Sequence, residues 1–359
     1  MRRCLILACL FMSVSVFAQT SVIKTTATKS NNYGVTYFLP KTEFVVKAKV
    51  LKVTEKAGPY YKYAQKYLGA GNPVVKDQVY YILDGVTVGS HGIPDKEQAY
   101  LIEFKTKTVA PFACLTEEGL LCTINAEYRP EQPATVPAQN REEAGISAQS
   151  VFTEEYLQAG SVVKMADITA KQIYRLRESR TDLITGEAEN IPRDGEAMKL
   201  VMQQLEAREK VLVELFQGTV VIEEQGYEVS LIPDGDTSNN ILFRFSKHLG
   251  VVGSDDLSGS PVYINIKQIN KTPEITDPKA LEARAKLAIN PKGIIYKVPG
   301  KAQVEVVYGT ESVFSGEMLV AQFGETQVLA PNILEDKKTS VQIFFYPETG
   351  AIKQILGGS

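Results

Sequence analysis

A row of tyrosines is the first feature of the sequence with the chemistry of a binding site. Tyr60, Tyr63 and Tyr67 stand at helical spacing after Pro59, and Gly69 can end such a helix. Aromatic rings on one helix face can stack on sugar rings, so these three tyrosines are a candidate carbohydrate-binding surface. The same spacing also suits a short helix that packs its rings against a sheet and leaves the hydroxyl groups at the edge.

An acidic segment further along the chain has oxygen ligands at the spacing of a calcium loop. Asp234, Asp236, Ser238 and Asn240 occupy positions 1, 3, 5 and 7 of such a loop. However, asparagine replaces the glycine of position 6, and phenylalanine replaces the glutamate of position 12. A polar β-turn explains the same residues. We therefore expect no cofactor, and calcium is the one alternative that the sequence suggests.

Two cysteines, Cys114 and Cys122, flank a Glu-Glu-Gly turn in an expected hairpin. An exported chain meets oxidising conditions, so a disulfide across this hairpin is one interpretation. Two ordinary strand cysteines that remain reduced are the other. Neither interpretation makes these residues catalytic.

The sequence contains no recognisable catalytic set. Its two histidines, His91 and His248, stand far from any Gly-x-Ser-x-Gly nucleophile turn, and their spacing does not fit a zinc site. No glycine-rich phosphate loop is present, and nothing singles out a catalytic pair among the 42 acidic residues. We therefore assign no catalytic residue.

The first residues are typical of a secretory signal peptide. Arg2 and Arg3 precede an apolar run from Cys4 to Phe17, and Ala18 suits the cleavage site, so we predict that residues 1–18 are removed. The run is shorter than the roughly 20 residues that cross a bilayer, and we expect no transmembrane segment in the mature chain. The expected location is exported, in the periplasm or associated with the outer membrane. Loss of two arginines makes the net charge of −3 more negative, which disfavours nucleic acid as a partner.

These residues must be positioned by a long, strand-rich chain. A length of 359 residues predicts two or three structural units. We expect an α+β, β-rich fold in which two short antiparallel β modules flank a helical hairpin with its own antiparallel sheet. The expected boundaries are an N-terminal β module with the tyrosine helix at 19–128, a proline-containing linker at 129–150, the hairpin and sheet at 151–290, and a C-terminal β module at 291–359.

The expected elements follow from hydrophobic periodicity and from turn residues. Pro40 is expected to separate two strands, and the segment Gly89–Asp95 is expected to separate the next two. Asp167 is expected to cap a helix that ends near Leu183, and a second helix is expected from about Gly195 to Phe216. The remaining expected elements are strands at 220–224, 227–232, 241–246 and 262–269 and a helix at 278–288.

Two segments recur in the same order, which suggests an internal duplication. The opening Gly34–Thr42 resembles Gly293–Lys301, with a glycine, apolar residues, a tyrosine and a proline in sequence. The hairpin Leu115–Ile124 aligns without a gap on Tyr346–Ile355, and both copies share a glutamate and a glycine in the turn. The alternative is chance, because glycine, proline and valine are common in any β protein.

Several segments resemble one protein family. They lie in the helical hairpin (Ile173–Arg180, Leu183–Glu187, Pro192–Gly195, Leu215–Gly218), in the N-terminal part (Tyr37–Thr42, Gly58–Gly69) and further on (Arg244–Ser246, Asp256–Gly259, Thr349–Ile352). Together they are similar to the family of domain of unknown function 4831, secreted proteins of Bacteroidetes. The resemblance spans nearly all of the mature chain. It implies an envelope location in a Gram-negative cell and carries over no activity and no functional residue.

The leading hypothesis is a non-enzymatic envelope protein that binds another, unidentified envelope protein or forms part of an assembly. It rests on the missing catalytic set and on abundant strand edges and tyrosines, which commonly serve protein contacts. The second hypothesis is a carbohydrate-binding accessory protein with a glycan partner on the tyrosine row. An enzyme of unrecognised type is the third.

Overall fold

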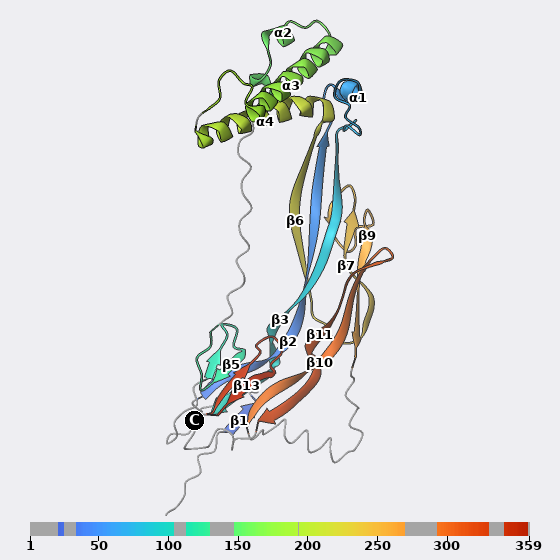
Figure 1. The fold of residues 1–359 in the computed structure, drawn as a ribbon. Helices are drawn as coiled ribbons and strands as arrows, with labels where there is room; N and C mark the ends of the chain where they lie inside the picture. The colour runs from blue at the N-terminus through green and yellow to red at the C-terminus, as the bar shows by residue number, and fades with distance from the viewer. Residues whose placement is uncertain are drawn as a thin grey trace, which may run out of the picture.

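The structure is a computed structural model that describes residues 21–24, 34–103, 113–129, 147–192, 194–269, 293–329 and 341–357. The predicted signal peptide, most of the predicted linker and the predicted helix at 278–288 lie outside these residues. The fold is α+β and rich in antiparallel strands, as predicted. It is elongated, with a helical unit at one end, a small sheet at the other, and a narrow sheet that runs between them (Figure 1).

Two long strands form the centre of the first sheet. β2 (Gly34–Lys56) pairs antiparallel with β3 (Gln78–Glu103), β1 (Ser21–Lys24) pairs with β3, and β6 (Thr219–Leu231) pairs with β2, which gives the order β1-β3-β2-β6. Apolar residues recur at every second position between 44 and 50, and this period of two determines which face of β2 is buried. Phe44, Val46, Ala48 and Val50 are buried on one face, and the intervening lysines are exposed on the other.

β2 and β3 each continue through the segments that were expected to interrupt them. Pro40 does not end a strand, and Gly89–Asp95 does not form a separate turn. Pro40 instead lies opposite Pro94, and the register shifts between Phe38 and Pro40. A proline donates no hydrogen bond to the ladder, and a bulge that sets two prolines opposite each other accommodates both without breaking the sheet.

The second sheet packs on the first and forms a sandwich. Its order is β11-β10-β9-β7-β8. The strands are β7 (Thr237–Ser246), β8 (Gly250–Val252), β9 (Ser260–Gln268), β10 (Ile294–Tyr308) and β11 (Glu311–Leu329). Its buried Phe243, Ile264 and Val304 meet Phe44 and Val46 of β2 in one hydrophobic cluster, which holds the two sheets together.

The third sheet closes the end of the molecule far from the helices. Its order is β13-β12-β5-β4, formed by β4 (Ala113–Leu115), β5 (Leu121–Ile124), β12 (Gln342–Phe345) and β13 (Ile352–Leu356). Strands from the predicted N-terminal and C-terminal modules therefore pair with each other here. Similarly, β6 from the predicted middle unit joins β2, and β9 joins β10. The three predicted units are interleaved.

The repeat in the sequence corresponds to equivalent hydrogen bonds. The Phe38 N–H donates to the Gly119 carbonyl at 2.9 Å, and the Lys297 N–H, at the aligned position, donates to the Gly350 carbonyl at 3.0 Å. Both glycines have a left-handed conformation, with φ of 88° and 71°. Each opening strand also shifts register at its proline. Each copy thus ties its opening strand to its own closing hairpin.

The helical unit lies at the opposite end. It contains the 3-10 helices η1 (Tyr61–Tyr63) and η2 (Ala148–Ser150) and the helices α1 (Ala64–Leu68), α2 (Glu154–Leu157), α3 (Val162–Thr185) and α4 (Gly195–Gln217). α4 agrees with the prediction, whereas α3 begins before Asp167 because the Ser161 side chain accepts the Lys164 N–H and caps it. Among the described residues, no helix is both long and apolar enough to cross a bilayer.

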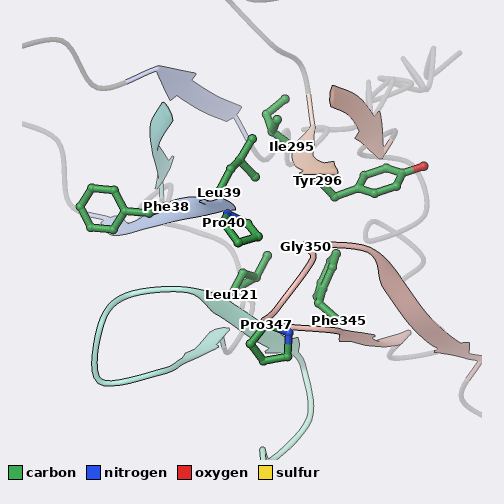
Figure 2. A pocket seen from close by; sticks show the side chains of 9 residues that line it. All are labelled: Phe38, Leu39, Pro40, Leu121, Ile295, Tyr296, Phe345, Pro347 and Gly350. Atoms are coloured by element: carbon green, nitrogen blue, oxygen red, sulfur yellow. The ribbon is translucent and has the colours of Figure 1, made fainter. Parts of the chain in front are cut away.

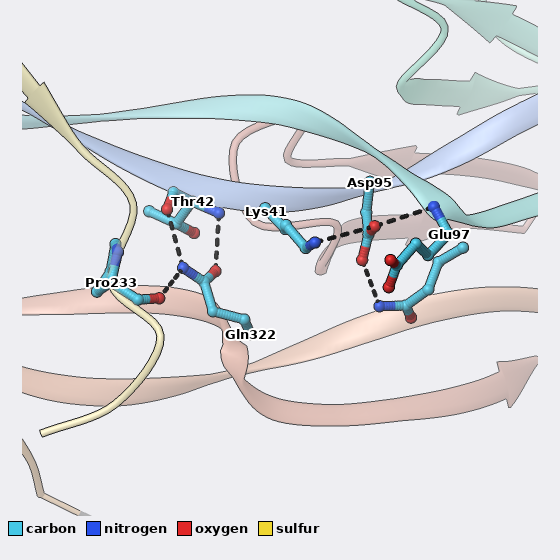
Figure 3. Close-up of polar contacts among 7 residues, drawn as sticks. Lys41, Thr42, Asp95, Glu97, Pro233 and Gln322 are labelled. Carbon is cyan, nitrogen blue, oxygen red and sulfur yellow. Dashed lines mark hydrogen bonds and ion pairs between the residues drawn. The ribbon is translucent and has the colours of Figure 1, made fainter.

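A buried polar joint connects the two large sheets (Figure 3). The Gln322 side chain on β11 accepts the Thr42 N–H at 2.8 Å and donates to the carbonyls of Thr42 and Pro233 at 3.0 and 2.7 Å. The hydroxyl oxygen of Thr42, which is fully buried, accepts the Ala321 N–H at 2.9 Å. These bonds give partners to the Ala321 N–H of β11, to both backbone groups of Thr42 and to the Pro233 carbonyl.

A buried carboxylate supports the same joint. Asp95 pairs with Lys41 at 3.2 Å and accepts hydrogen bonds from the Glu97 N–H and the Gln98 side chain. Burial acts to raise the pKa of Asp95, but the hydrogen bonds and Lys41 outweigh it, so the pKa lies below its usual range. The nearby Lys297 is buried, and loss of hydration lowers its pKa. Asp95 therefore stays ionised and fixes the bulged residues 95–98.

We predict that Thr42→Val destabilises the protein, because valine keeps the shape but leaves the buried Ala321 N–H without an acceptor. The expected loss in the free energy of unfolding is about 1–3 kcal/mol. Urea unfolding followed by circular dichroism measures it. Thr36→Val, an exposed position on the same strand, is the matched control and should change stability little. Equal effects of the two substitutions would contradict a structural role for the Thr42 hydroxyl.

Candidate functional site: the free edge of strand β6

β6 is placed by the way in which α4 ends. Gly218 has a φ of 79°, its N–H donates to the Glu214 carbonyl at 2.8 Å, and the chain then turns into the strand. A Cβ atom at this position would lie 2.4 Å from the Lys56 carbonyl oxygen at the end of β2. Only glycine allows both the conformation and this close approach. From Thr219 onward the β-branched residues favour a strand beside β2.

One edge of β6 is paired and the other is open. β6 pairs with β2 along its whole length without a register shift, from Thr219 opposite Lys56 to Leu231 opposite Phe44. β6 is the last strand of its sheet, and no strand in the described part of the chain pairs with its outer edge. The nine consecutive residues 220–228 are exposed. Figure 1 shows β6 along the side of the narrow sheet, below the helices.

Three apolar residues stand together on this open strand. Val220, Val221 and Ile222 are 53, 45 and 60% exposed. Successive residues of a strand point to opposite faces, so β6 itself is exposed on both faces at this point. Val79 and Ile82 of β3 are also exposed there. We call these five residues, Val79, Ile82, Val220, Val221 and Ile222, the stalk surface.

Three glutamates follow on the same strand, and each meets a lysine of β2. Glu223 pairs with Lys52 at 2.8 Å, Glu224 with Lys49 at 3.2 Å and Glu228 with Lys47 at 3.3 Å. The hydrogen bond from Lys52 to Glu223 raises the pKa of that lysine, which therefore stays charged. Such exposed ion pairs add little stability. They show, however, that β6 accepts lysine side chains from a neighbouring strand.

The other outer strands are short or engaged. β1, β4, β8 and β13 have only 4, 3, 3 and 5 residues. β11 is long and is engaged at one point, where Ala321 donates its N–H to Thr42 and the adjacent Gln322 side chain holds the same residue. Its residues 311–319 have no pairing strand on the outer side. Short or covered edges are the usual protection against unwanted pairing. What distinguishes β6 among the described strands is its run of nine consecutive exposed residues, 220–228, on an edge that has no pairing strand.

A family model described as domain of unknown function (DUF4831) matches residues 33–353. The chain belongs to this family. The match spans the first long strand and the helical unit, reaches into the closing hairpin, and includes the whole of β6. Searches of curated proteins and of solved structures gave no match.

The structure places the three tyrosines in the core of the helical unit. Tyr60 is 2% exposed, packs against Phe216 and shares a hydrogen bond between hydroxyl groups with Tyr156. Tyr63 and Tyr67 are partly buried against the same cluster. Burial also raises the pKa of the Tyr60 hydroxyl. The row does not form the open, flat aromatic face that stacking on a sugar requires.

Two of the four residues of the predicted calcium loop lie in a strand. Asp236 accepts the Gln268 N–H at 2.7 Å, and Ser238 and Asn240 already belong to β7. Alternate residues of a strand lie roughly 6.6 Å apart. Ligands of one calcium ion must instead meet within about 2.6 Å of it, so strand geometry does not suit Asp234 and its three companions. Across the described residues, no cluster of three His, Cys, Asp or Glu side chains could hold a metal.

Cys114 and Cys122 are both free thiols. Cys114 lies opposite Thr123, and the register shift between Cys114 and Leu115 leaves Cys122 outside the pairing. Burial raises the pKa of the Cys122 thiol to about 11, so it stays protonated. These cysteines therefore act as strand residues in this DUF4831 structure.

Two hollows offer little for catalysis. Figure 2 shows the first, at the base, where Pro40, Ile295, Phe345 and six other residues enclose about 10 Å³, roughly one water molecule. The second, of about 250 Å³, lies where α4 meets the end of β2, and Glu214 is the one acidic residue in its lining. Neither hollow brings two carboxylates together.

The sequence contains a signal for the exposed edge of β6, although none of the sites expected from the sequence includes it. Three apolar residues in succession, Val220 to Ile222, break the alternation that a strand with one wet face shows. A fully buried strand gives the same pattern. The exposure of these three residues is decided by the second sheet, because β6 packs on the core of the sandwich through Val229 and Leu231 and not through Val220 to Ile222.

We predict that Gly218→Ala loosens the helical unit from the sheet, because alanine adds both a left-handed strain and a clash with Lys56. The expected loss of stability is about 2 kcal/mol or more. Thermal unfolding followed at the helical circular dichroism signal measures it. Gly226→Ala on β6 is the matched control, since no atom lies within 4 Å of its added Cβ. Similar melting curves for both variants would contradict this role of Gly218.

Proposed function

We propose that this DUF4831 protein is a non-enzymatic component of the cell envelope that binds another protein through the free edge of β6. The observation that carries the proposal is the run of nine exposed residues, 220–228, on an outer strand. An exposed strand edge offers backbone N–H and C=O groups to an incoming strand, and its side chains add specificity.

The composition of β6 supports binding rather than protection. Soluble proteins usually block a long edge with proline, inward-pointing charge or lysine. β6 contains neither proline nor lysine, and β2 supplies a lysine to each of its three glutamates. An edge strand with three exposed β-branched residues and compensated charges remains able to pair.

The rigid surroundings also favour recognition. The helical unit holds one end of β6 through Gly218, and at the other end Val229 and Leu231 pack on the sandwich core. A strand fixed at both ends loses little conformational entropy when it binds. The envelope location rests on the predicted signal peptide at 1–18, from which we propose an exported protein of the periplasm or the outer membrane.

We predict that a photocrosslinking amino acid at position 222, introduced in the native host, gives a discrete product with another protein. The same label at Leu257, which is 82% exposed on a turn of the second sheet, is the control for random collision. Crosslinked bands are resolved by electrophoresis and identified by mass spectrometry. The proposal predicts a band that is specific to position 222. Identical patterns at both positions, or no product at either, would contradict it.

A further inference from the structure

We propose that the partner of β6 contributes an extended antiparallel strand of basic and β-branched residues, similar in pattern to β2. This inference rests on the proposed function and specifies its partner. A strand presents the same side chains to the neighbours on both of its edges. The strand already bound to β6 therefore shows what the open edge can accept.

β2 meets β6 with a defined pattern. Val53 and Thr54 lie opposite Ile222 and Val221, so β-branched residues pair across the apolar part. Lysines occupy the acidic part. The lysines are Lys47, Lys49 and Lys52, whose ammonium groups lie 2.8–3.3 Å from Glu228, Glu224 and Glu223. A partner strand on the other edge meets the same apolar run followed by the same acidic run.

The glutamates retain capacity for a second cation. Each of the ion pairs with β2 uses the Oε2 atom of its glutamate, and all three carboxylates are about half exposed. A carboxylate accepts several hydrogen bonds through its two oxygens. Lysine or arginine side chains from the open edge can therefore reach Glu223, Glu224 and Glu228 without displacing β2.

A second copy of β6 fits the open edge less well than a basic strand does. The segment Thr219–Leu231 contains three glutamates and no lysine or arginine. Antiparallel pairing of two such strands brings no cation to the acidic run, and it can set glutamates close to each other. Charge complementarity thus favours a different, basic strand over self-association.

The test uses the mature full-length chain and two labelled peptides in fluorescence anisotropy titrations. The first peptide copies residues 44–56 of β2, and the second replaces its lysines at the positions of Lys47, Lys49 and Lys52 with glutamate. We expect saturable binding of the basic peptide and about tenfold weaker binding of the acidic one, from three exposed ion pairs. Added salt should reduce this difference.

A variant with Glu223→Gln, Glu224→Gln and Glu228→Gln tests whether the preference for the basic peptide depends on β6. It should bind both peptides with similar affinity, while Glu311→Gln and Glu317→Gln on β11 should leave the preference unchanged. Equal affinity of wild-type protein for both peptides, or no binding of either, would overturn the inference. Self-association of the protein without peptide, seen by sedimentation, would overturn it in favour of a second copy.

This experiment separates the two claims. A crosslinked partner at position 222 together with no preference for the basic peptide leaves the proposed function standing and removes the basic-strand inference. The partner peptide recovered from that crosslink gives an independent check, because the inference requires lysine or arginine near the crosslinked residue.

Discussion

The pairing of β2 with β3 is the constraint on which the rest of the structure depends. β2 is 23 residues long, which corresponds to roughly 75 Å of extended chain. Along this length it contributes Tyr37 and Leu39 to the base, residues 44–50 to the sandwich, and its end to the contact with α4. The register of this pair shifts where Pro40 lies opposite Pro94, but the two strands remain paired on both sides of the shift. The clusters of the base and of the sandwich therefore contain residues of one continuous strand, whose end contacts the helical unit, and segments distant in sequence must assemble on it.

The open edge of β6 follows from this architecture. The first sheet must extend beyond the sandwich to reach the helical unit, and there it is narrow, and its outer strand β6 is exposed on both faces (Figure 1). A sheet of this kind buries little apolar surface, so its stability comes from the rigid units at its two ends. The exposed stalk surface is then a consequence of the fold that the protein can use for binding. The buried joint around Thr42, by contrast, engages the outer edge of β11 at Ala321 and Gln322.

Local patterns in the sequence predict part of the fold. The alternation of apolar residues and lysine predicts the solvated face of β2. The helical pattern that begins near Gly195 and stops at Gly218 predicts α4. The aligned turn glycines predict the two related hairpins. Long-range register could not be predicted. Pro40 resembles a strand end until Pro94, 54 positions further along, is placed opposite it. Tyr60 resembles a surface residue until Phe216 and Tyr156 cover it. Likewise, Val220 to Ile222 fit a buried strand equally well, because their exposure depends on where a different sheet ends.

Amide hydrogen exchange on the isolated mature protein tests the central claim most directly. In an outer strand with an open edge, every second N–H points away from the sheet and exchanges quickly, whereas its neighbours are protected by β2. An open edge on β6 predicts this alternation along residues 220–228, and pairing on both sides of β2 predicts continuous protection along residues 44–54. Uniform slow exchange along residues 220–228 would show that the edge is covered in the free protein and would contradict the account.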